Sequence, residues 1–341
     1  MKRIWIAGLI ALFVVALTAC GGANNNQSAN TGANAVAVET TAPAATAVPT
    51  EVAASPAAVE DSTRTIEYLG KQYTVPSNVE RIVITGSMEA LEDALVLDVH
   101  PVGAITFGGV FLERFAAITD KAESIGEKSE PNFETILKLK PDVILGTTKF
   151  KPEVVEQLEK IGTTILVSHI ADNWEANLNL MAELTGKQDQ AQKAIAAYQE
   201  DLVTAKGTIG DKLKDQKVLA IRIRAGKMFV YPTSVFVNPI LYGDLGLTAP
   251  AEVIASKAQE AISVEQLAAI NPDYMFVQFS TDENAETQTA WEDLQNNAII
   301  QKINAMKNNK TFVNVIDPLS EGGPAWSRIY FLKAAVEQFS K

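Results

Sequence analysis

One pattern of helix, Pro-Asp and strand occurs twice in the chain. The first copy runs from Asn132 to Gly146 and the second begins at Ser263. Each copy has a polar cap, a short amphipathic helix that opens with a glutamate, a Pro-Asp pair and an apolar strand. A helix ends before a proline, and an apolar run after it is typical of a buried parallel strand. The two glutamates, Glu134 and Glu265, lie 131 residues apart, roughly one domain length. The repeat therefore predicts two α/β lobes of related construction.

The first residues have the pattern of an export signal. Lys2 and Arg3 precede an apolar run at 4–17, which is too short to span a bilayer comfortably. The run ends in Leu-Thr-Ala-Cys, which resembles the lipobox of bacterial lipoproteins, so we expect lipid attachment at Cys20 on the outer face of the cell membrane, more typical of Gram-positive cells. The alternative is a plain signal peptide. Cys20 is the only cysteine, which excludes a disulfide framework and a thiolate metal cluster.

The segment after Cys20 is rich in Ala, Asn, Thr and Pro and has no aromatic residue, so it predicts a disordered tether. The chain carries a net charge of −12, or −14 without the two basic residues of the signal. This charge argues against a nucleic acid or an anionic membrane surface as partner. The expected organisation is a signal peptide at 1–19, an anchor and tether at 20–62, a first lobe at 63–171, a connecting helical region at 172–212 and a second lobe at 213–341.

A single long helix is predicted between the lobes. From Gln188 to Ile209 the apolar residues recur at helical spacing without a proline. About 22 residues at 1.5 Å each would extend about 33 Å, which is enough to bridge two domains. We expect a stiff connector.

Signatures of catalysis are scarce. The chain has no G-x-S-x-G, P-loop or G-x-G-x-x-G motif. Its two histidines, His100 and His169, are far apart in sequence and are interpreted as structural or surface residues. We therefore expect a protein that is not an enzyme and has no site for a bare metal ion.

The sharpest sign of a ligand site is the pair Arg222 and Arg224. In a strand these residues point to the same face, where two guanidinium groups repel unless an anion lies between them. The alternative is an edge strand whose arginines pair with nearby carboxylates. Aromatic residues in expected loops add the walls of a cleft: Phe107, Phe111 and Phe150 in the first lobe, Tyr231 in the second, and Trp326 in a mobile loop before the last helix. The alternative for Trp326 is a place in the core.

Three motifs carry a family resemblance: P-N-F-E-T-I-L-K-L-K-P-D, Y-G-D-L-G-L and D-P-L-S-E-G-G-P-A-W-S. With the lipobox and tether, residues 63–341 resemble the substrate-binding lipoproteins of ATP-driven iron–siderophore importers. The resemblance implies a class III periplasmic-binding-protein fold, α/β, with two Rossmann-like lobes of mainly parallel sheets joined by one long rigid helix. It also implies a monomer that delivers an intact ferric chelate to an ABC importer permease.

The resemblance also assigns roles to residues. Glu134 and Glu265 match glutamates that reach arginine pockets on the two permease halves. Lys128 stands where hydroxamate-binding relatives carry an arginine that touches the ligand, and this change keeps the charge but loses the planar guanidinium. Other positions match ligand-facing residues of relatives: Lys149 and Phe150 loosely, and Arg222, Arg224 and Trp326 more closely.

The implied ligand is a ferric hydroxamate or citrate-hydroxamate siderophore. The chelator holds the iron, so no protein cofactor is expected. The alternative is a cobalamin- or haem-binding lipoprotein of the same fold. Haem would prefer an axial tyrosine or histidine in the cleft, and cobalamin would have little use for two arginines.

Overall fold

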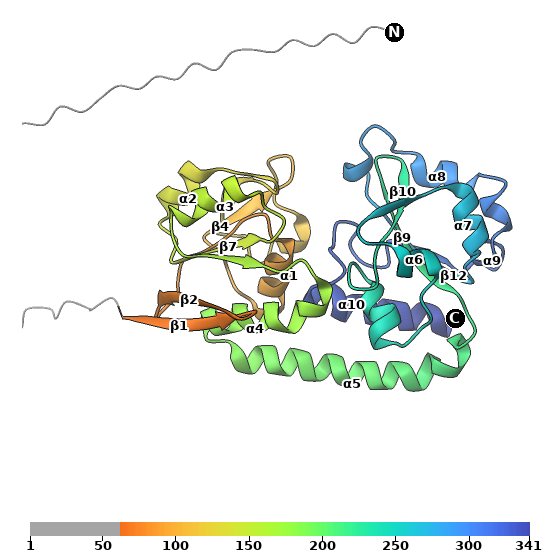
Figure 1. Ribbon diagram of the computed structural model, residues 1–341, viewed down its shortest axis with the longest axis horizontal. Coiled ribbons are helices and arrows are strands. Elements are labelled where there is room, and N and C mark those ends of the chain that lie inside the picture. Colours follow the sequence, from red (N-terminus) through yellow and green to blue (C-terminus); the bar gives the residue numbers. More distant parts are fainter. Residues whose placement is uncertain (1–61) are drawn as a thin grey trace, which may run out of the picture. The chain divides into compact units, whose positions relative to one another are not determined.

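The computed structural model describes residues 62–341, which belong to one compact unit with two lobes (Figure 1). The predicted signal peptide, the lipid attachment at Cys20 and nearly all of the predicted tether lie outside the described residues. Within residues 62–341, no helix combines the length and the apolar character needed to cross a membrane.

The first lobe contains a sheet of six strands in the order β6-β5-β4-β3-β7-β8. All neighbouring strands are parallel except β5 and β6. The strands are β3 (Ile82–Ile84), β4 (Gly103–Thr106), β5 (Glu123–Glu127), β6 (Glu130–Pro131), β7 (Val143–Thr147) and β8 (Thr164–Val167). Its helices are α1 (Met88–Leu97), α2 (Phe133–Leu139), α3 (Pro152–Glu159) and α4 (Trp174–Thr185). A separate antiparallel hairpin precedes them, β1 (Thr63–Tyr68) and β2 (Lys71–Pro76).

The second lobe contains a five-stranded sheet in the order β11-β10-β9-β12-β13. This sheet is mixed, whereas the sequence favoured mainly parallel strands. Ala225 and Gly226 both have positive φ, 45° and 73°, and they turn β9 directly into an antiparallel partner, β10. The strands are β9 (Val218–Arg224), β10 (Lys227–Val230), β11 (Glu260–Ile262), β12 (Tyr274–Phe279) and β13 (Thr311–Val313).

The second lobe has four short helices, α6 (Ala251–Ala255), α7 (Val264–Ile270), α8 (Ala290–Gln295) and α9 (Asn304–Lys307), and the longer terminal helix α10 (Ala325–Ser340). Single helical turns complete the two lobes: η1 (Glu113–Phe115), η2 (Ala171–Asn173), η3 (Pro239–Asp244), η4 (Asp282–Asn284) and η5 (Ile300–Lys302). Each lobe thus presents helices on a central sheet, as expected for an α/β fold.

The repeated stretch forms the same unit in both lobes. Asn132 caps α2 by accepting the Thr135 N–H, and Ser263 caps α7 in a reciprocal capping box with Gln266. Both helices end in a residue with positive φ before the proline. Strands β7 and β12 follow, as the sequence predicted.

The aspartates of the two Pro-Asp pairs have a common structural task. The Asp142 carboxylate accepts the backbone N–H of Arg81, and the Asp273 carboxylate accepts that of Lys217, at 2.8 and 2.9 Å. These two basic residues also donate from their side chains to carbonyl oxygens at the ends of α2 and α7. Each Pro-Asp pair therefore attaches its strand to the start of the neighbouring central strand, β3 or β9.

The predicted connector is the helix α5 (Gln188–Leu213), of 26 residues, which packs against α4 and α10 (Figure 1). Arg328 of α10 is buried where these helices meet. Its guanidinium forms an ion pair with Asp244, donates to the Ala171 carbonyl at 3.0 Å and lies over the rings of Trp174 and Tyr198. The Tyr198 hydroxyl donates to Asp244 at 2.5 Å. This cluster connects elements of both lobes.

Candidate ligand-binding site

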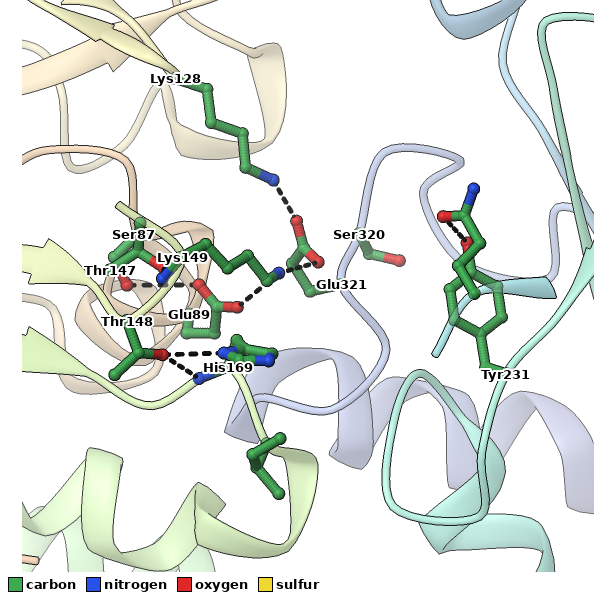
Figure 2. A network of polar contacts seen from close by, with 12 residues as sticks. Ser87, Glu89, Lys128, Thr147, Thr148, Lys149, His169, Tyr231, Ser320 and Glu321 are labelled. Atoms are coloured by element: carbon green, nitrogen blue, oxygen red, sulfur yellow. Dashed lines mark hydrogen bonds and ion pairs between the residues drawn. The ribbon is translucent and has the colours of Figure 1, made fainter. Parts of the chain in front are cut away.

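Polar side chains gather at the carboxyl ends of the parallel strands in the first lobe. Glu89 follows β3, Lys128 follows β5, Lys149 follows β7 and His169 follows β8 (Figure 2). Open α/β sheets bind ligands at this edge because the loops after neighbouring strands meet there. The elements of the fold therefore place these four side chains together although they are distant in sequence.

Both lysines of this edge face a carboxylate from the other end of the chain. Glu321, in the segment before α10, forms an ion pair with Lys128, and its other oxygen lies 3.7 Å from Lys149 Nζ (Figure 2). Lys149 Nζ also lies 3.4 Å from a carboxylate oxygen of Glu89. The lysine side chains are 32% and 44% exposed, and that of Glu321 is 17% exposed. The two cations therefore remain partly accessible from solvent.

The two arginines of β9 share one carboxylate. Arg222 binds Glu283 with two hydrogen bonds, at 2.8 and 2.9 Å, and Arg224 binds the same group at 2.6 Å. Arg224 and the Tyr231 hydroxyl also donate to Gln259 Oε1, at 2.9 and 3.0 Å. The sequence prediction that both guanidiniums lie on one face is confirmed. The alternative is wrong about the edge, because β9 lies in the middle of the sheet, but its pairing of the two arginines with a nearby carboxylate is confirmed.

The charged groups of the site shift the pKa values of their neighbours. Burial alone would raise the pKa of Glu321, but Lys128 and Lys149 outweigh it and hold that pKa well below its usual value. Burial alone would lower the pKa of Lys149, whereas Glu321 and Glu89 raise it. The pKa of Glu89 is raised by burial and by the nearby Glu321 carboxylate. The site therefore holds Glu321 ionised and Lys149 charged.

A narrow cavity lies between the two lobes. Its lining includes Glu89, Lys149 and His169 from the first lobe and Phe236 and Glu321 from the second. His169 was expected to be a structural or surface residue, yet it lies within this site. Its Nδ1 lies 2.8 Å from the Thr148 hydroxyl, and burial followed by the charge of Lys149 lowers its pKa.

The predicted aromatic residues have different surroundings. The Phe150 ring covers Gly86, where a Cβ atom would lie 2.2 Å from the ring, and Phe107 packs against the first-lobe core. Tyr231 is buried against Phe236, with ring centroids 5.1 Å apart, beside the arginine pair. Tyr231 is thus the aromatic residue that directly contacts the polar network of the second lobe.

The prediction that Trp326 lies in a mobile loop is wrong. It belongs to the first turn of α10, where its ring packs on Tyr330 and on the guanidinium of Arg114. These residues line a groove beside α1 that contains none of the four predicted basic residues. A ligand contact for Trp326 remains a prediction, and this position does not favour it.

Three buried acidic residues of α1 escaped the sequence analysis: Glu89, Glu92 and Asp93. Glu92 accepts the backbone N–H groups of Glu321 and Ser327, at 3.0 and 3.2 Å, and Asp93 accepts that of Ala325 at 3.3 Å. Carboxylates at a helix N-terminus complement its unpaired N–H groups. Helix α1 thus caps α10 and holds the segment that carries Glu321. The sequence did offer a signal for this role, namely three carboxylates in an otherwise apolar helix. Carboxylates are buried only when they have partners, so such a helix indicates paired acidic groups.

The described residues contain no group of three or more His, Cys, Asp or Glu side chains that could hold a metal ion. The polar groups of the site are instead four cations, Lys128, Lys149, Arg222 and Arg224, and the carboxylates that pair with them. Such groups can bind the oxygen atoms of an anion.

Comparison with known proteins gives three informative matches. The family model described as "Periplasmic binding protein" matches residues 111–314. The iron-uptake system-binding protein of Bacillus subtilis is 48% identical over 341 residues, which is the full length of both chains. The probable siderophore-binding lipoprotein YfiY of the same organism is 28% identical, covering 67% of this chain and 73% of that protein.

A solved structure has a similar fold. The triscatecholate siderophore-binding protein FeuA from Bacillus subtilis, crystallised with ferri-bacillibactin, superposes with a TM-score of 0.79. It is 53% identical, and the match covers 81% of this chain and 98% of that one.

Proposed function

Because the chain belongs to the periplasmic binding protein family, we propose that it captures a ferric siderophore between its lobes and delivers it to an ABC importer permease. It is a substrate-binding protein and not an enzyme. The observation that carries the proposal is the convergence of four cationic side chains from two lobes at the carboxyl edges of their sheets.

The charge of the site favours one class of chelate. Three catecholate dianions around Fe³⁺ leave a complex with three negative charges, whereas three hydroxamate monoanions leave a neutral one. Two lysines and two arginines match the oxygen-rich, anionic surface of the first complex better. The sequence resemblance favoured a hydroxamate or citrate-hydroxamate. The relative solved with ferri-bacillibactin instead supports a tris-catecholate as the ligand proposed for this chain.

The proposed place of the protein is the outer face of the cell membrane, attached through Cys20. The Leu-Thr-Ala-Cys sequence supports this proposal. The relative YfiY, which is named a lipoprotein, supports it as well. A lipid anchor would keep the receptor near a membrane permease, and the tether would provide the reach.

A titration tests the ligand class. We expect ferri-bacillibactin to quench the intrinsic fluorescence of the purified protein and to bind at least about 100-fold more tightly than a neutral ferric tris-hydroxamate, which corresponds to about 2.8 kcal/mol. The preference should shrink as salt increases, because the partly exposed cations are screened.

Two results would overturn the proposal. Equal affinity for the neutral and the anionic chelate would reject the tris-catecholate class. If no ferric chelate binds and the protein shows a Soret band after incubation with haem, the haem-binding alternative is favoured.

A further inference from the structure

Glu321 differs from the other acidic residues of the site because its ion pairs cross from one lobe to the other. Its carboxylate belongs to the segment before α10 and contacts Lys128 and Lys149 of the first lobe. Among residues 62–341, it is the carboxylate that pairs with both of these lysines (Figure 2). The two lysines proposed to bind the ligand are thus already paired with one of the protein's own carboxylates.

Glu283 provides a useful contrast in the second lobe. It pairs with Arg222 and Arg224 of the same lobe, and it binds Arg222 with two parallel hydrogen bonds. The Arg222 side chain is only 6% exposed. Removal of such a partner would leave a buried, unpaired charge, which is strongly unfavourable. Glu283 therefore positions the arginines. Its displacement by a ligand is unfavourable because the hydrogen bonds to the buried Arg222 would be lost.

The lysine pairs of Glu321 have the opposite character. Both lysine side chains are about one-third or more exposed, so a ligand can approach them from solvent. The Glu321 side chain is 17% exposed and its charge is stabilised by both lysines, so an anion must carry more charge than one carboxylate to replace it. The backbone near Glu321 is held independently, because the Glu321 N–H donates to Glu92 at 3.0 Å. The Ser320 carbonyl also accepts from Gln278 at 3.0 Å. The side chain can therefore rotate away while its segment stays in place.

We propose that Glu321 is a built-in counter-anion that an anionic ligand must displace from Lys128 and Lys149, and that returns to them when the ligand leaves. This inference rests on the proposed function. The ligand can bind only to those molecules in which the Glu321 carboxylate has left the lysines. The apparent affinity is therefore the intrinsic affinity multiplied by the fraction of such molecules. A chelate with three negative charges can outcompete one carboxylate, whereas a neutral chelate cannot. Glu321 thus determines selectivity for charge and assists release.

The test compares Glu321→Gln with Glu123→Gln. Both variants remove one negative charge, but Glu123 is exposed at the start of β5 and makes no ion pair within residues 62–341. We expect Glu321→Gln to bind ferri-bacillibactin about tenfold more tightly, mainly through slower dissociation in stopped-flow fluorescence. Glu123→Gln should bind as the wild type does. Thermal unfolding of both variants verifies that they are folded.

A second measurement needs no ligand. Trace acetylation followed by peptide mass spectrometry reports how reactive each lysine is. We expect the reactivity of Lys128 to rise several-fold in Glu321→Gln and to stay unchanged in Glu123→Gln, because the Glu321 carboxylate contacts the Lys128 amine directly and shields it from the reagent.

The outcomes separate this inference from the proposed function. Wild-type protein that binds ferri-bacillibactin, with a Glu321→Gln variant of equal or weaker affinity, would overturn the inference alone. Unchanged reactivity of Lys128 would overturn it as well. Wild-type protein that binds no anionic ferric chelate would overturn the proposed function, and the role of Glu321 in ligand exchange with it.

Discussion

Arg222 and Arg224 occupy the same strand face and share Glu283, but their surroundings differ. The side chain of Arg222 is 6% exposed and that of Arg224 is 38% exposed. Arg222 also donates to the Ser320 carbonyl at 3.4 Å, near the segment that carries Glu321. Arg222 therefore contributes to the folded structure as well as to the site, whereas Arg224 is free to contact a ligand at its exposed side.

Substitution of the two arginines should separate these tasks. We expect Arg224→Ala to weaken ferri-bacillibactin binding by about 1.5–3 kcal/mol, the range for a hydrogen bond to a charged group. Its free energy of unfolding should change by less than about 0.5 kcal/mol. Arg222→Ala should lower the free energy of unfolding by about 1–3 kcal/mol, because the largely buried Glu283 loses two hydrogen bonds and keeps only its pair with Arg224.

Fluorescence titration and urea unfolding of both variants provide the measurements. Lys227 lies at the exposed start of β10, close to the two arginines in sequence. Lys227→Ala is therefore a suitable control for the loss of one positive charge. Wild-type affinity in Arg224→Ala would show that the ligand does not use this face of β9.

At the scale of elements, the repeated helices α2 and α7 present equivalent glutamates. Glu134 and Glu265 lie in the first turns of these helices, and both residues are exposed. The pKa of Glu265 is lowered by its own backbone N–H and by the Ser263 side chain. A favourable place at a helix start is one explanation of both residues. Docking to two permease halves is the other, and it is the one we propose.

The variants Glu134→Gln and Glu265→Gln distinguish these explanations. If the glutamates dock on the permease, each change should reduce iron uptake by cells, and the double change should nearly abolish it. Ligand affinity and unfolding of the purified protein should stay as in the wild type. Uptake of radiolabelled iron by cells is the measurement, with ligand titration as its control. Normal uptake with the double variant would mean that other residues contact the permease.

At the scale of the whole described unit, two connections hold the lobes. Helix α5 packs against α4 and α10, and α1 caps the N-terminus of α10 through Glu92 and Asp93. Arg328 joins these elements with its ion pair to Asp244. A hinge needs a few residues that absorb a large backbone change, and two packed connections restrict it.

We therefore expect ligand binding to move the lobes only slightly. The radius of gyration from small-angle X-ray scattering should change by less than about 1 Å between ligand-free and ferri-bacillibactin-loaded protein, in keeping with the small shifts of pre-organised complexes. A substantially larger decrease on binding would show that α5 and α10 permit wide closure.

Local sequence signals determined much of the fold. Capping residues, the two Pro-Asp pairs and the apolar periodicity predicted α2, α7, α5 and the strands beside them, because these signals act over a few residues of chain. Alternation along β9 likewise predicted that Arg222 and Arg224 share a face.

The tertiary structure determined which carboxylates pair with those cations. Glu321 lies 193 residues from Lys128, and Glu92 lies 235 residues from Ser327. No local pattern encodes such pairs. Burial and pairing of a carboxylate depend on which loops the two sheets bring together, and the same holds for the position of Trp326 in α10. The sequence thus determined the units and the cations, while packing of the lobes selected the carboxylates that neutralise them.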